Sequence, residues 1–175
     1  CRERSNRLHS IATGRTIFMS GQGSPVKLVA PDAAGLKVVV VAGQWHEQIA
    51  QGLIDGASRY LDSSGADWSL VRVPGSFELP LGAQKALESG ADAVVALGVI
   101  IRGGTPHFEH VAQATTEGLT RVALDAGKPV GFGVLTVEDE KQGLDRAGLA
   151  GSSEDKGAEA ADAAIQLALT LRGWS

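Results

Sequence analysis

Apolar positions follow two alternating patterns from residue 36 onward. Short, wholly apolar runs rich in β-branched residues predict strands that are covered on both faces, because half-exposed strands alternate apolar with polar positions. The predicted strands are residues 38–41, 70–73, 93–101 and 129–136. Between them, apolar residues recur at the spacing of one buried helix face. The predicted helices are residues 45–61, 77–88, 106–125, 138–147 and 155–171.

This alternation of strands and helices predicts the fold class. It indicates a three-layer α/β/α sandwich, flavodoxin-like in kind, with a four-stranded parallel sheet. Sheets of this type bind ligands outside the carboxyl ends of their strands. We therefore expect the loops after Ala42, Val73, Ile101 and Thr136 to form one functional rim.

The N-terminal segment departs from this pattern. We expect residues 36–175 to form one domain and residues 1–35 to form an arm or leader that is partly disordered. Residues 1–18 carry four arginines and one acidic residue. They have the composition of an organelle transit peptide but lack clear amphipathicity. The favoured interpretation is that Met19 is the natural start and that residues 1–18 are additional upstream sequence.

Composition and charge exclude several classes of protein. The chain is 43% hydrophobic and 21% charged, with a formal net charge of −4. An acidic balance argues against nonspecific nucleic-acid binding, and no apolar run approaches the roughly 18 residues that span a bilayer. The single Cys1 forms no internal disulfide, and no Cys/His spacing predicts a metal site. We expect a cytoplasmic protein without metal or redox cofactor.

The turn after the third predicted strand carries the first candidate chemistry. Gly103 and Gly104 allow close backbone approach to a ligand. Thr105 is a good N-cap, and Pro106 suits the first position of a helix, whose free N–H groups attract anions. His107, near the positive end of the helix, is favoured as a neutral imidazole that can pass a proton. The residues alone support equally well a simple helix cap with a surface histidine.

Two further cations lie near helix ends. Arg146 precedes Gly148 at the end of a predicted short helix, where the dipole alone favours a cation. Lys156 follows a capping sequence in which Ser152 and Asp155 have capping-box spacing. A lysine in the first turn of a helix opposes the dipole. Its position therefore calls for an anionic ligand or a neighbouring carboxylate, and the ligand is the favoured interpretation.

Aromatic and polar residues occur on two other loops of the predicted rim. Trp45 follows the first strand, where its ring can stack on a planar heterocycle or simply cover the sheet edge. Ser76, Phe77 and Glu78 begin the next helix, where a hydroxyl and a carboxylate suit a polyhydroxylated ligand. Helix capping by Ser76 and a favourable dipole interaction of Glu78 explain the same residues without a ligand. His46 fits an ordinary solvated helix position.

Several segments together resemble the lumazine synthase family. The resemblance runs from about residue 36 to residue 171, in order and without large gaps. The matching segments are residues 73–80 (VPGSFELP), 96–108 (ALGVIIRGGTPHF), 131–136 (GFGVLT), 145–148 (DRAG) and 154–157 (EDKG). No single motif is decisive, but five motifs in register are a specific signal.

The resemblance implies a reaction and a set of site residues. The reaction is the transferase condensation of 5-amino-6-ribitylaminouracil with 3,4-dihydroxy-2-butanone 4-phosphate to 6,7-dimethyl-8-ribityllumazine, releasing phosphate and water, in riboflavin biosynthesis. By position, His107 matches the proton-transfer residue. The residues matching pyrimidine and ribityl contacts are Trp45, Ser76, Phe77, Glu78, Val99, Ile100, Ile101 and Phe132. Those matching phosphate contacts are Gly104, Thr105, Arg146 and Lys156.

The resemblance also implies an assembly. Members of the family are homopentamers with each site at a subunit boundary, and some assemble into sixty-subunit capsids. Phe132 matches an aromatic residue supplied by the neighbouring subunit. The segment 149–153 is slightly longer than the bend of capsid formers, which favours a free pentamer. The alternatives are a non-catalytic flavin- or lumazine-binding relative and a monomeric flavodoxin-like binding or regulatory domain.

Overall fold

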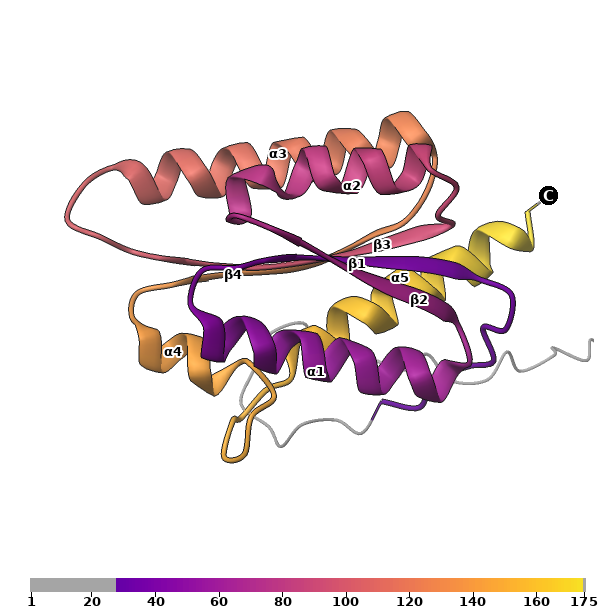
Figure 1. Cartoon of the computed structure of the whole chain (residues 1–175), viewed down its shortest axis with the longest axis horizontal. Helices are drawn as coiled ribbons and strands as arrows, with labels where there is room; N and C mark the ends of the chain where they lie inside the picture. Colours follow the sequence, from indigo (N-terminus) through magenta and orange to yellow (C-terminus); the bar gives the residue numbers. More distant parts are fainter. Residues whose placement is uncertain (1–27, 175) are drawn as a thin grey trace, which may run out of the picture.

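A computed structural model describes residues 28–174 of the chain as an α/β/α sandwich (Figure 1). Its central sheet has four parallel strands in the order β2-β1-β3-β4. The strands are β1 (Lys37–Gly43), β2 (Asp67–Val73), β3 (Ala93–Ile101) and β4 (Val130–Val137). The predicted fold class is therefore confirmed. The predicted arm falls largely in residues 1–27, which lie outside the described residues.

Helices cover both faces of the sheet. On one face lie α1 (Glu47–Ser64), the short α4 (Glu140–Asp145) and α5 (Lys156–Arg172) (Figure 1). On the other face lie α2 (Leu79–Glu88), which follows the short 3₁₀ helix η1 (Ser76–Glu78), and α3 (His107–Ala126). Among residues 28–174, no helix combines the length and apolar character needed to cross a bilayer.

Two hydrophobic layers hold the helices to the sheet. Val38, Val40 and Ala42 of β1 point into the layer under α1 and α5, whereas Val41 points into the layer under α2 and α3. Both faces of the central strands are thus buried, which explains why their sequences are apolar without alternation. Leu28 and Ala30, just before the predicted domain boundary, also pack against the first layer.

Close contact between α1 and α5 depends on glycine. A Cβ atom at Gly157 would lie 2.0 Å from the Leu53 carbonyl oxygen, and one at Gly56 would lie 2.1 Å from the Asp155 carboxylate. Any larger residue would push the two helices apart. This contact fixes where α5 begins and hence where Lys156 lies.

Candidate active site

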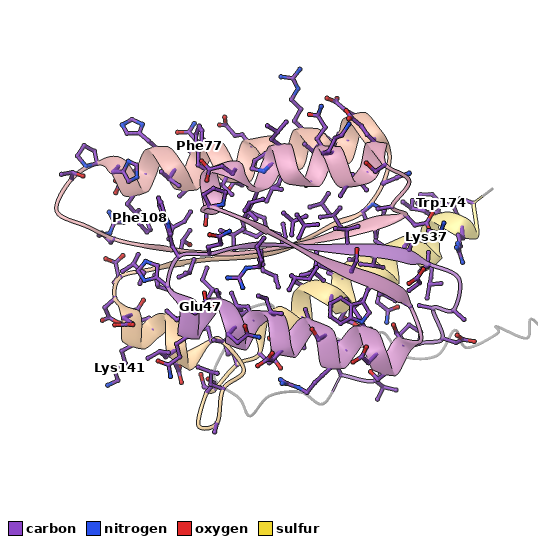
Figure 2. The ribbon with its side chains drawn as sticks, viewed as in Figure 1. Lys37, Glu47, Phe77, Phe108, Lys141 and Trp174 are labelled. Atoms are coloured by element: carbon purple, nitrogen blue, oxygen red, sulfur yellow. The ribbon has the colours of Figure 1, made fainter. Side chains whose placement is uncertain are left out.

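The loops that follow the four strands gather at one end of the molecule, where the sequence predicts the functional rim. In Figure 1 this is the left end, from which α1, α3 and α4 begin. Figure 2 shows Glu47, Phe77 and Phe108 toward this end, whereas Lys37 and Trp174 lie at the opposite end. All predicted site residues except Phe132 lie on these loops, at the ends of β3, or in the segment that leads into α5.

Trp45 lies against the turn that follows β2. The residue is 65% exposed, and a Cβ atom on Gly75 would come within 3.2 Å of its ring. The Gln44 amide donates to the carbonyl oxygens of Val73 and Pro74 at 2.9 and 3.2 Å, which ties the two loops together. The structure therefore brings Trp45 beside the segment 76–78 and leaves most of its ring open for stacking.

His46 departs from the expected helical position. It is the N-cap of α1 in a left-handed conformation, with φ of 57°, and it is the one non-glycine residue with positive φ among residues 28–174. Such a conformation is uncommon outside glycine and often marks a functional site. Histidine gives no strong sequence signal for this geometry, so sequence reasoning missed it.

The segment 76–78 differs from its prediction in one respect. Ser76 is only 5% exposed, and its hydroxyl lies 3.5 Å from the Val99 carbonyl oxygen, so the hydroxyl faces the interior instead of the rim. Nor is Ser76 the cap, because Gly75 precedes η1 and donates its N–H to the Glu78 carboxylate at 2.9 Å. Phe77 is 62% exposed. Of the three side chains, Phe77 is therefore exposed and Glu78 half-buried, whereas the Ser76 hydroxyl is turned away from the rim.

The end of β3 extends beyond its pairing with β1 and leaves backbone groups there without a partner strand on that side among residues 28–174. Pairing with β1 ends at Ala42 and Leu97, although β3 continues to Ile101. The N–H groups of Val94 and Arg102 both point toward β4 and donate there to Pro129 and Val137. Because alternate residues of a strand point to the same side, Val99 and Ile101 face the opposite side, where β1 has ended. The backbone N–H of Ile100 points instead toward β4, as those of Val94 and Arg102 do.

The glycines of the turn at residues 103–107 are required neither by backbone conformation nor by crowding. Gly103 and Gly104 are absent from the positive-φ residues, and a Cβ atom on either would meet nothing within 4 Å. Within residues 28–174 the space beside both glycines is open, so a ligand or a second subunit can approach the backbone closely there. His107 is exposed at the first position of α3.

The cap of α3 differs from the one predicted. Pro106 is the N-cap, and no side chain caps the helix. Thr105 lies one residue before it, and its hydroxyl does not cap α3. The predicted cap fails because the helix begins one residue later than predicted, so Thr105 precedes the N-cap position from which a side chain reaches the first N–H groups. Among the described residues, the N–H groups of His107 and Phe108 have no acceptor and can bind an external partner, whereas the N–H of Glu109 lies against its own carboxylate.

Arg102 is paired with acids on both sides. Its guanidinium lies 4.2 Å from the centre of the Phe108 ring and donates to Glu109 and, at 2.9 Å, to Glu138. Hydrogen bonding to Arg102 lowers the pKa of Glu109. Arg102 thus links the end of β3 to α3 and to the segment after β4, and its charge is matched by these two acids.

Phe132, Arg146 and Lys156 share a hollow on the open edge of β4. We call it the β4 hollow; it has a volume of about 210 Å³, and residues 133–137 complete its lining. In the part of the chain that the structure describes, β4 is an edge strand that pairs only with β3. Phe132 is 47% exposed and pairs with Ala96, well before the end of β3. An aromatic ring and two cations thus face outward at one place.

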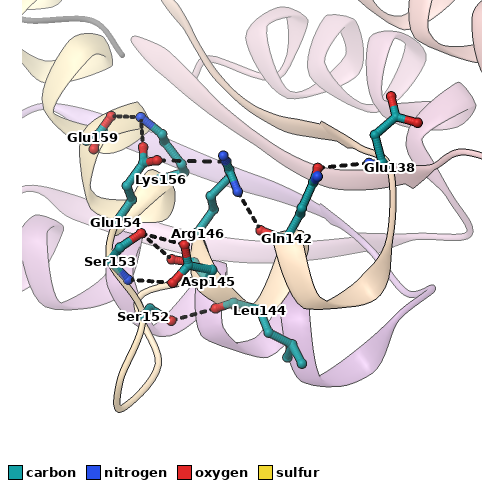
Figure 3. Close-up of polar contacts among 10 residues, drawn as sticks. All are labelled: Glu138, Gln142, Leu144, Asp145, Arg146, Ser152, Ser153, Glu154, Lys156 and Glu159. Atoms are coloured by element: carbon teal, nitrogen blue, oxygen red, sulfur yellow. Dashed lines mark hydrogen bonds and ion pairs between the residues drawn. The ribbon is translucent and has the colours of Figure 1, made fainter. Parts of the chain in front are cut away.

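The two cations of the β4 hollow already have carboxylate neighbours (Figure 3). Lys156 Nζ lies 2.5 Å from Glu154 Oε2 and 2.8 Å from Glu159 Oε2. Burial lowers the pKa of Lys156, but the hydrogen bonds from these carboxylates outweigh it, and the pKa is raised. Arg146 Nη1 donates to the Gln142 carbonyl at 3.0 Å. Neighbouring carboxylates therefore suffice to explain the unusual position of Lys156, and the expected capping role falls to Asp155, not Ser152.

The predicted site residues therefore form two groups within one chain. The first group lies on the rim around the end of β3, and its members are Trp45, Phe77, Glu78, Val99, Ile101, Gly104, Thr105 and His107. The second group is the trio of the β4 hollow, which none of the first group lines. The first group offers stacking, backbone hydrogen bonds and a free helix N-terminus. The second offers two cations and an aromatic ring.

Fold and geometry define a class: a flavodoxin-like α/β protein with a stacking and hydrogen-bonding rim and a separate cationic hollow. Comparison with known proteins gives the family. Residues 35–172 match the family described as 6,7-dimethyl-8-ribityllumazine synthase, and the chain belongs to this family.

Curated relatives carry the same description over nearly their whole length. The protein of Leifsonia xyli subsp. xyli is 69% identical over 154 residues, which are 88% of this chain and 98% of the relative. That of Clavibacter michiganensis subsp. michiganensis is 63% identical over 155 residues, 88% of this chain and 97% of the relative. That of Streptomyces coelicolor is 55% identical over 158 residues, 90% and 98% respectively. Each is named 6,7-dimethyl-8-ribityllumazine synthase.

Proposed function

We propose that this chain condenses 5-amino-6-ribitylaminouracil with 3,4-dihydroxy-2-butanone 4-phosphate to 6,7-dimethyl-8-ribityllumazine, releasing phosphate and water. The observation that carries the proposal is the 69% identity to a relative of that name over 98% of its length. The reaction consists of amine attack on a ketone, loss of phosphate and ring closure. It needs orientation of two substrates, a phosphate site and a proton shuttle.

The rim is the proposed site of the pyrimidine substrate. The exposed ring of Trp45 stacks on the heterocycle, while the Val99 N–H and the backbone groups of Ile101, on the side where β1 has ended, bond to its polar edge. Val99, Ile100 and Ile101 together form the wall of this part of the site. Phe77 and Glu78 contact the ribityl chain, and Ser76 contributes through its backbone because its hydroxyl faces inward.

The phosphate substrate lies next to the turn at residues 103–107. The amides of Gly104 and Thr105 and the free N–H groups of α3 suit an anion, and the open space beside both glycines supports this placement. His107, exposed at the start of α3, is the proposed proton-transfer residue. Arg146 and Lys156 supply the positive charge.

We further propose that the second half of each site comes from a neighbouring subunit. Phe132 is expected across the boundary from the resemblance, and the structure groups Arg146 and Lys156 with it in the β4 hollow. A neighbour that presents Phe132 therefore presents all three residues. One chain contributes its rim to one site and its β4 hollow to the next.

Open edges of the sheet support a homo-oligomer. Among residues 28–174, neither β2 nor β4 has a partner strand on its outer side, and Leu70 and Val71 of β2 are exposed. Exposed apolar edge strands invite pairing with another chain. We propose a homopentamer built from the domain of residues 36–175, with a sixty-subunit capsid as the alternative, in the cytoplasm.

A direct assay tests the synthase activity. The purified protein is mixed with both substrates, and product absorbance and phosphate release are followed against the uncatalysed reaction. We expect both signals to rise together. A folded protein that binds the lumazine product without accelerating its formation would support the non-catalytic relative instead. The exposed His107 beside the open helix end favours the enzyme, since a simple binder needs no proton shuttle.

A further inference from the structure

Glu154 lies between the two cations of the β4 hollow. Its Oε2 is 2.5 Å from Lys156 Nζ, and its Oε1 is 3.8 Å from Arg146 Nε (Figure 3). Each oxygen of the carboxylate thus faces a different cation. Glu154 does not line the hollow, although both cations do. The carboxylate therefore contacts the pair from outside the hollow that a ligand would enter.

The backbone holds Glu154 in this place. Its N–H donates to the Asp145 carbonyl at 3.1 Å, and its own carbonyl accepts from the Gly148 N–H at 2.9 Å. The next residue, Asp155, caps α5 by accepting from the Ala158 N–H at 3.0 Å. These contacts fix the backbone of Glu154 beside the start of α5, and the ion pairs with Arg146 and Lys156 hold its carboxylate between the two cations.

Charge in this cluster balances without any ligand. Arg146 and Lys156 contribute two positive charges, and Glu154 and Glu159 contribute two negative charges within ion-pair distance. Two unopposed cations would attract the phosphate of the substrate strongly, but they would hold the released inorganic phosphate just as strongly. A fixed carboxylate beside them lowers the positive potential of the hollow for both.

We propose that Glu154 is a built-in counter-ion that sets how tightly Arg146 and Lys156 hold phosphate, and so allows the released phosphate to leave. This inference rests on the proposed role of these two cations in phosphate binding. Glu154 acts through the cations and does not itself touch the substrate. Removing its charge while keeping its shape then strengthens phosphate binding.

Calorimetric titration of the assembled protein with inorganic phosphate tests the inference. We expect Glu154→Gln to bind phosphate on the order of ten-fold more tightly than the wild type, because a negative charge beside the anion is lost. Glu154→Asp, which draws the carboxylate back by one methylene, should bind with intermediate affinity. Inhibition of turnover by added phosphate should strengthen by the same factors.

A matched control separates this local effect from a change in net charge. Glu140 lies exposed in the neighbouring helix α4 and forms an ion pair with neither cation. Glu140→Gln should therefore leave the phosphate affinity within about two-fold of the wild type, since exposed charges act weakly through solvent. Equal tightening in both glutamine variants would overturn the proposal.

Two further outcomes distinguish a failure of the counter-ion proposal from a failure of the proposed phosphate site on which it rests. If Arg146→Ala loses phosphate affinity while Glu154→Gln binds phosphate no more tightly than the wild type, Glu154 only positions the cations and the counter-ion proposal is wrong. If Arg146→Ala and the wild type bind phosphate equally, the phosphate site itself is misplaced, and both proposals fall together.

Discussion

Replacing Arg146 by alanine tests the proposed phosphate site. The guanidinium lies in the β4 hollow and is 35% exposed, with Glu154 at 3.8 Å. A hydrogen bond to a charged group contributes about 1.5–3 kcal/mol. Partial exposure and the existing carboxylate partner place Arg146 at the low end of that range. About 1.5–2 kcal/mol corresponds to a loss of roughly ten- to thirty-fold in kcat/KM for the phosphate substrate.

The assay compares the two substrates separately. Steady-state rates are measured while one substrate is varied and the other is saturating, so kcat/KM is obtained for each. We expect a loss of roughly ten- to thirty-fold for the phosphate substrate and less than about three-fold for the pyrimidine. Arg146→Lys should lie between the wild type and the alanine variant, because it keeps the charge but loses the planar fork. Equal losses for both substrates would refute the assignment.

A stability control belongs to the same experiment. Arg146 donates to the Gln142 carbonyl at the end of α4, so alanine also removes a C-terminal helix contact. That contact contributes about 0.3–1 kcal/mol. Denaturant unfolding of the variant should show a loss of this size and no more, which leaves the protein folded under assay conditions. A larger loss would mean that the kinetic change reports unfolding.

Three other variants follow from the structure. Gly98→Ala places a Cβ atom 2.5 Å from Ser76 Oγ, so urea unfolding should show a loss of about 1–3 kcal/mol; an unchanged midpoint would contradict the packing. Burial first, and then its 2.5 Å hydrogen bond to Asp162, raise the pKa of Tyr60 above its ordinary 10.0. The neutral phenol is thus favoured in the folded state. The wild-type free energy of unfolding should therefore keep its full value below about pH 10 and fall as the pH rises further toward the raised pKa of the folded state. In Tyr60→Phe this dependence on pH should be absent. His107→Ala should reduce kcat by about 100-fold or less, since orientation supplies much of the rate; stopped-flow rates equal to those of the wild type would remove it from the mechanism.

The patterns of strands and helices predicted the fold because a strand that is buried on both faces has an uninterrupted run of apolar residues. Residues 93–101 form β3 as predicted, and the apolar run has no polar interruption that would blur its ends. Helix starts were predicted less well. Thr105 and Ser152 have the chemistry of caps, but Pro106 and Asp155 hold those positions. Where several residues that can cap a helix follow one another, tertiary contacts decide which of them becomes the N-cap. A local sequence pattern does not contain those contacts.

In the candidate site, too, some residues could be predicted from local patterns, whereas the positions of others depend on tertiary contacts. Trp45 and Glu78 could be found from their places after strands, because the carboxyl ends of parallel strands share one edge. The inward orientation of Ser76 depends on Gly98 of a distant strand, which leaves room for its hydroxyl. The grouping of Phe132 with Arg146 and Lys156 depends on β4 being the edge strand. Strand order is a property of the whole fold, so that grouping required the structure.

Complementation between two impaired variants tests most directly whether each site is divided between subunits. His107→Ala damages the rim half and Arg146→Ala damages the β4 hollow, so each variant assembled alone lacks one half of every site. When equal amounts of both chains are co-assembled, random pairing restores an intact site at about a quarter of the boundaries. We predict recovery of about a quarter of wild-type kcat/KM for the phosphate substrate. Activity no higher than the average of the two separate variants, in confirmed mixed assemblies, would contradict the divided site.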